Sequence, residues 1–110
     1  MDRGFDGMGL DDEAERLSTI LGNKRVMVMG NHGFMTVAET PAIAFDLAYY
    51  FERACRTYLT AKSTDLELSV IPDKIAEKTA KQWEVQDVTV DKHLTVIRKI
   101  LDEEEPEYRL

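Results

Sequence analysis

The chain has 110 residues, of which 44% are hydrophobic and 32% are charged, and its formal net charge is −7 at pH 7. This length allows one domain with a modest core. The acidic balance argues against a nucleic-acid partner, and the sequence shows no basic patch for an anionic membrane. Much of the acidity lies near the C-terminus, where we expect residues 102–110 to form a solvated acidic tail.

The chain has a single cysteine, Cys55, so a disulfide within one chain is impossible and a reducing compartment is favoured. No apolar run approaches the ~18 residues of a membrane span, and Met1–Leu10 lacks the basic and apolar blocks of a secretory signal. We therefore expect a cytoplasmic protein with no membrane partner. Because Cys55 lies among apolar residues of a predicted helix, we expect a buried, inert thiol.

The first ten residues hold three of the six glycines and show no periodic pattern, so residues 1–10 are expected to be loose. Asp11 and Asp12 can then cap a helix with an acidic first turn, and Gly22-Asn23 can end it. The predicted helix has one apolar stripe, formed by Ala14, Leu17, Ile20 and Leu21.

The next stretch, Arg25–Glu39, consists of two apolar runs on either side of the polar turn Gly30-Asn31-His32-Gly33. Short apolar runs interrupted by Gly and Asn predict two strands joined by a tight turn. Gly and Asn tolerate the positive φ that such a turn often needs. The hairpin would hold His32 at a strand end, where an imidazole can face a cleft.

A long helix is predicted from Ala42 to about Ala61, with Thr40 as its N-cap and Pro41 in its first turn. Its broad apolar stripe leads us to expect burial along much of its length, with the aromatic residues in the core. The stripe comprises Ile43, Leu47, Tyr50, Phe51, Ala54, Cys55, Tyr58 and Leu59.

The remaining chain is predicted to form an extended segment and two helices. Leu66–Ile71 alternates in polarity, and Lys74–Glu84 has an apolar side opposite charged residues. Val88–Leu101 is the last predicted helix, and Pro106 stops any continuation.

The stretch Val26–Cys55, VMVMGNHGFMTVAETPAIAFDLAYYFERAC, resembles the class II aldolase/adducin family. The similarity extends over roughly Gly9–Glu84. It implies an α/β fold: part of a three-layer α/β/α domain, with a short antiparallel β-hairpin packed by helices. We accordingly expect residues 1–110 to form a single partial domain of this type, corresponding to its C-terminal portion.

The resemblance also implies a metal and a chemistry. In family enzymes such as L-fuculose-phosphate aldolase, the histidine at the position of His32 is one of three zinc ligands. Zinc there acts as a Lewis acid on an enediolate, so the complete protein would be a lyase acting on small sugar phosphates or hydroxy-carbonyl compounds. The resemblance further implies a homo-oligomer.

The other parts of that family site have no counterpart in the sequence: the His-x-His pair that provides two more ligands, the Gly- and Ser-rich phosphate loop, and the proton-transferring acid. His93 is expected to be a partly exposed helix residue. The carboxylates nearest in sequence to His32 are Glu39, Asp46 and Glu52, and the last two lie on different faces of one helix. A lone imidazole binds zinc too weakly, so the chain by itself is expected to be inactive.

Three alternatives remain open. Backbone hydrogen bonds alone can hold a turn histidine such as His32 without any ligand role. The chain can instead be a non-catalytic, adducin-like oligomerisation module, for which the hairpin supplies apolar surface. A small stand-alone enzyme of unrelated activity is the weakest interpretation, because the sequence offers no nucleophile–base pair. The apolar surface of the second alternative consists of Val26, Val28, Phe34 and Val37.

Overall fold

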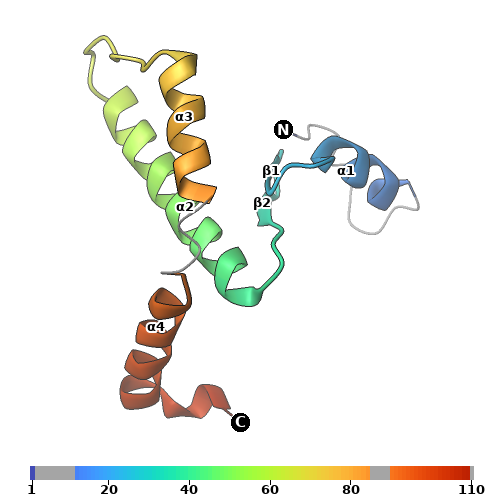
Figure 1. The fold of residues 1–110 in the computed structure, drawn as a ribbon, viewed down its shortest axis with the longest axis vertical. Coiled ribbons are helices and arrows are strands. Elements are labelled where there is room, and N and C mark those ends of the chain that lie inside the picture. The colour runs from blue at the N-terminus through green and yellow to red at the C-terminus, as the bar shows by residue number, and fades with distance from the viewer. Residues whose placement is uncertain (2–11, 85–89, 110) are drawn as a thin grey trace. The chain divides into compact units, whose positions relative to one another are not determined.

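The computed structural model of the chain describes residue 1, residues 12–84 and residues 90–109 (Figure 1). Residues 1–48 and residues 49–110 form two compact units, which are described separately below. The described elements, in chain order, are α1 (Glu13–Leu21), β1 (Val26–Met29), β2 (Gly33–Thr36), α2 (Pro41–Lys62), α3 (Asp73–Glu84), α4 (Val90–Glu104) and the 3-10 helix η2 (Pro106–Arg109).

Helix α1 lies where the sequence predicts a helix, but its N-terminal cap differs. Asp12 occupies the N-cap position with helical backbone angles and makes no side-chain cap hydrogen bond, and Asp11 lies outside the described residues. The favourable charges are those of Glu13 and Glu15 in the first turn. Gly22 ends the helix as predicted: its φ is +51°, and its N–H donates to the Ser18 carbonyl over 2.9 Å.

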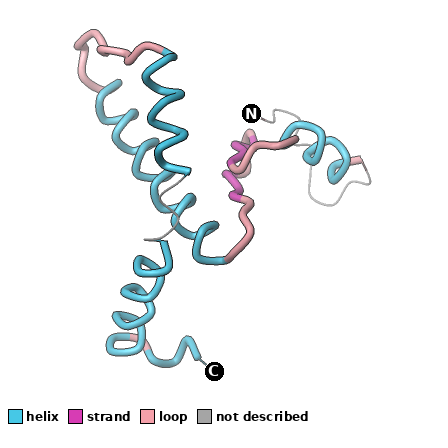
Figure 2. The backbone as a smooth tube through the Cα atoms, viewed as in Figure 1, coloured by secondary structure: helices cyan, strands magenta, loops and turns pink. Residues whose placement is uncertain are grey.

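The predicted hairpin is confirmed. Strands β1 and β2 pair antiparallel, with Met27 opposite Met35 and Met29 opposite Gly33 (Figure 2). Asn31 adopts a φ of +60°, the left-handed conformation that Asn tolerates better than most residues. Met27 is only 3% exposed, which makes it the most buried apolar residue among those described.

The hairpin connects to the start of α2 through specific hydrogen bonds. Thr40 caps the helix as predicted, because its hydroxyl accepts a 3.3 Å hydrogen bond from the Ile43 N–H. The Thr36 hydroxyl donates a 3.0 Å hydrogen bond to the Ala44 carbonyl, which ties β2 to the first turns of α2. Ala42 is buried beside this junction. The mixed α/β class with an antiparallel hairpin packed by helices is therefore confirmed.

The expectation that α2 is buried along much of its length is wrong. Ala42 is its only buried residue, whereas Leu59 is 66% exposed and Tyr58 is exposed as well. Cys55, predicted to be buried, is also exposed. The periodic pattern correctly marks the apolar face of the helix, but periodicity contains no information on whether another element covers that face.

In the second unit, α3 lies beside α2, and the Trp83 ring meets the Tyr50 ring at a centroid distance of 5.0 Å (Figure 1). Residues 66–71, for which the sequence predicts an extended segment, form no strand and lie in the loop before α3. Helix α4 continues to Glu104, three residues beyond the predicted end at Leu101. Val90 is the buried residue on its predicted apolar face.

Candidate functional site

His32 lies in the turn of the hairpin, between β1 and β2. Its N–H points back to the Met29 carbonyl at 3.4 Å, and the left-handed conformation of Asn31 sets the direction of the chain just before it. The residue is exposed. The hairpin therefore presents an imidazole to the outside at a fixed place in the chain, a geometry compatible with metal ligation in which His32 is one ligand.

Two of the carboxylates nearest in sequence to His32, Glu39 and Glu52, pair with arginines. Glu39 lies 3.5 Å from the Arg25 guanidinium, so it forms an ion pair at the base of the hairpin. Glu52 accepts hydrogen bonds of 2.6 and 3.1 Å from Arg56, one turn further along α2. Asp46 is half-buried on α2.

A catalytic zinc ion typically needs three protein ligands and an open fourth position. Across residues 12–84 and 90–109, no three His, Cys, Asp or Glu side chains are grouped closely enough to hold a metal ion together. The described residues by themselves therefore do not fit a complete zinc site.

His93 belongs to a different environment. It is half-buried on α4, and its ring meets the Tyr49 ring edge to face at 4.7 Å. Tyr49 also contacts Tyr50 at 5.3 Å and lies under the Arg53 guanidinium at 5.4 Å. The row of aromatic residues in the sequence is the only signal for this cluster. The sequence could not predict that His93 takes part, because that contact requires α4 to approach α2.

A polar cluster lies at the C-terminal end of the described residues. The Tyr108 hydroxyl donates a 2.6 Å hydrogen bond to Asp102, and the Arg109 guanidinium pairs with the same carboxylate. The hydrogen bond from Tyr108, followed by the interactions with Arg109, lowers the pKa of Asp102 below its ordinary value of 3.8. The Asp102 cluster (Asp102, Tyr108 and Arg109) thus holds η2 against the end of α4, and no sequence motif predicted it.

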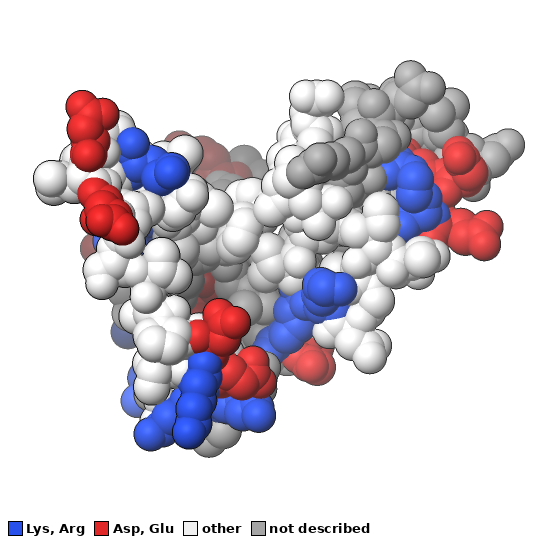
Figure 3. Space-filling view, turned by 90° about the horizontal axis from the view of Figure 1, so that it is seen from above, with Lys and Arg blue, Asp and Glu red and all other residues white. Residues whose placement is uncertain are grey.

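Charged side chains of both signs are interspersed on the face of the molecule shown in Figure 3. Among the helices that the structure describes, none is both long enough and apolar enough to cross a membrane. These two observations point to no candidate site besides His32 in the hairpin.

Comparison with known proteins gives a family match that includes α1, the hairpin and most of α2. Residues 4–59, just over half of the chain, match the family described as Class II Aldolase and Adducin N-terminal domain. The chain therefore belongs to the class II aldolase/adducin family.

Individual relatives come from both branches of that family. A Pseudomonas aeruginosa protein whose name places it among class 2 aldolases is 32% identical over 64% of this chain. An adducin-related protein of Schizosaccharomyces pombe is 31% identical over 88% of the chain. A Caulobacter vibrioides protein, also named for the class 2 aldolases, is 29% identical over 71%. The chain spans only about a third of the length of these relatives, between 28% and 32%. No solved structure matches the chain.

Proposed function

We propose that this chain supplies His32 as one ligand of a zinc site whose other ligands lie outside the chain. The complete assembly would be a class II aldolase-like lyase acting on small sugar phosphates or hydroxy-carbonyl compounds in the cytoplasm. Residues 1–110 would then form part of one family domain, its C-terminal portion, and would be inactive alone.

The observation that carries this proposal is the placement of His32. It is exposed in the turn of a hairpin that lies inside the segment matching the family. An exposed imidazole on a hydrogen-bonded turn needs little reorganisation to bind a metal ion. The scarcity of neighbouring ligands among the described residues supports the need for further ligands from elsewhere.

Metal content and activity test the proposal. The purified chain is dialysed against zinc and its metal content is measured, with the His32→Ala variant as the matched control. We expect much less than one zinc ion per chain and no aldol cleavage of a sugar phosphate. One tightly bound zinc ion per monomer, lost in His32→Ala, would contradict the need for outside ligands.

The encoding DNA offers an independent test. An upstream open reading frame encoding a His-x-His pair would provide the two further ligands. Co-expression of that product with this chain should then yield zinc binding and cleavage activity that depend on His32. Zinc binding by the co-expressed pair that survives His32→Ala would remove His32 from the site.

One observation favours a second function, a non-catalytic oligomerisation module. One matched relative, which aligns with 88% of this chain, is named adducin-related, and Phe34 and Val37 of the hairpin region are exposed apolar residues. A homo-oligomer without zinc would support this alternative. A monomer containing stoichiometric zinc would contradict both functions.

A further inference from the structure

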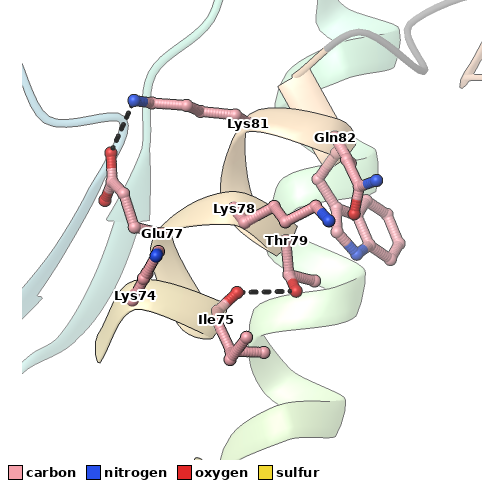
Figure 4. Close-up of a pocket in the computed structure, with 8 residues that line it drawn as sticks. Lys74, Ile75, Glu77, Lys78, Thr79, Lys81 and Gln82 are labelled. Atoms are coloured by element: carbon pink, nitrogen blue, oxygen red, sulfur yellow. Dashed lines mark hydrogen bonds and ion pairs between the residues drawn. The ribbon is translucent and has the colours of Figure 1, made fainter. Parts of the chain in front are cut away.

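Helix α3 carries three lysines on one face. Lys74, Lys78 and Lys81 are spaced i, i+4 and i+7, so they form a single stripe about 10 Å long. Of the three, Lys81 forms an ion pair, at 3.4 Å with Glu77 of the same helix. Figure 4 shows this pair and the Lys78 and Lys74 side chains extending from the same helix. We refer to these three residues as the lysine stripe.

Apolar surface adjoins the lysine stripe. A hollow of about 1010 Å³ runs along α3, and the lysines line it together with Ile75 and Trp83. Ile75 is 49% exposed. Its backbone carbonyl accepts a hydrogen bond from the Thr79 hydroxyl (Figure 4). A helix face with this composition suits a partner that has negative charge and at least one apolar group.

The same chain carries a segment of that kind. Glu103, Glu104, Glu105 and Glu107, the acidic segment, are all exposed, and Tyr108 beside them keeps 46% of its surface exposed. The Asp102 cluster fixes this segment, because both Tyr108 and Arg109 bind Asp102 across the bend between α4 and η2. A fixed segment loses less conformational entropy on binding than a flexible tail.

Within one chain the two charged sets are not paired with each other. Among the described residues, no ion pair joins a lysine of the stripe to a glutamate of the acidic segment. In the part of the chain that the structure describes, Lys74 and Lys78 form no ion pair, and Lys81 pairs only with Glu77 of its own helix, so the two surfaces keep opposite signs. Because each copy has both surfaces, two copies can exchange them reciprocally, as a two-fold dimer requires.

We propose that the lysine stripe of α3 binds the acidic segment of a second copy of this chain, with Tyr108 packing toward Ile75. The acidic segment supplies both features that suit the stripe and the hollow beside it, four exposed carboxylates and a half-exposed aromatic ring. This inference does not depend on the zinc proposal, because neither surface includes His32.

The experiment measures the mass of the full chain by light scattering over a range of concentrations, in a reducing buffer. We expect a dimer that dissociates when the salt concentration rises from about 50 mM to about 500 mM, because salt screens exposed ion pairs. Replacing all three lysines of the stripe by glutamate should weaken dimerisation by about tenfold or more.

Global repulsion is controlled with a matched triple variant, Lys24→Glu, Lys62→Glu and Lys92→Glu, which changes the net charge equally at exposed positions outside the stripe. This control should dimerise markedly better than the stripe variant. Replacing the four glutamates of the acidic segment by lysine in the stripe variant should restore the dimer. Circular dichroism confirms that each variant remains helical.

A second variant guards against misfolding of the stripe variant. Replacing the four glutamates by glutamine makes the chain less acidic, which by itself would favour association, yet the proposal requires weaker dimerisation. A monomer at every concentration, a dimer insensitive to both sets of substitutions, or equal losses in the stripe variant and its matched control would overturn the proposal.

Discussion

The Tyr108 hydroxyl donates a 2.6 Å hydrogen bond to Asp102, six residues earlier in the chain, and so joins η2 to the last turn of α4. The bond favours the ionised carboxylate, and the pKa of Asp102 is accordingly lowered. Because the folded-state pKa lies below the unfolded value, the Asp102 cluster stabilises the fold fully above the unfolded pKa. This stabilisation is lost as the pH falls through the folded-state pKa.

The first prediction concerns this carboxylate. Tyr108→Phe removes the largest cause of the shift, so the pKa of Asp102 should rise toward 3.8. A pH titration followed by NMR of the side-chain carboxyl carbons measures the change. Tyr58→Phe, at an exposed tyrosine of α2, serves as the control and should leave Asp102 unchanged. An identical Asp102 titration in wild type and Tyr108→Phe would mean that the hydrogen bond does not form in solution.

The second prediction concerns the link between the hairpin and α2. Thr36→Val keeps the side-chain shape but loses the hydrogen bond to the Ala44 carbonyl. The free energy of unfolding should fall by about 0.5–1.5 kcal/mol, measured by urea denaturation. Thr36→Ser retains the hydroxyl and should lose less. If valine proves as stable as threonine, the bond contributes nothing at this junction.

The third prediction separates the roles of His32 and Met27. His32→Ala should change the free energy of unfolding by less than about 0.5 kcal/mol, because the side chain is exposed. Met27→Ala, at a residue 3% exposed in the same hairpin, should cost about 2–5 kcal/mol. A loss above about 2 kcal/mol for His32→Ala would identify a structural histidine held by hydrogen bonds.

The fourth prediction tests the backbone of the turn. Asn31 has a φ of +60°, which a β-branched residue adopts only with strain. Asn31→Val should therefore destabilise the chain by about 1–2 kcal/mol, whereas Asn31→Gly should be nearly neutral. Asn23→Val, at a residue without positive φ, is the control. Equal effects at both positions would argue against a left-handed turn.

The sequence predicted the local structure of this chain well. Hydrophobic alternation around Gly30 and Asn31 predicted the hairpin, and the Thr40-Pro41 pair predicted the start of α2, because caps and turns depend on a few neighbouring residues. The single matching ligand, His32, was named from family resemblance, and its role as a ligand remains a prediction.

The sequence could not predict which apolar faces are covered. The stripe through Tyr58 and Leu59 has a helical period, but these residues are exposed because burial depends on a distant element packing against them. The Asp102 cluster escaped prediction for a related reason. It forms only when the chain bends after Glu104 and returns Tyr108 to α4.

The exposure of Cys55 on α2 has a practical consequence. Because no second cysteine exists in the chain, air oxidation can join this thiol only to a thiol of another molecule. Samples stored without reductant would accumulate covalently linked pairs whose mass imitates that of a reversible complex. Substituting serine at position 55 prevents this artefact and leaves every charged group in place.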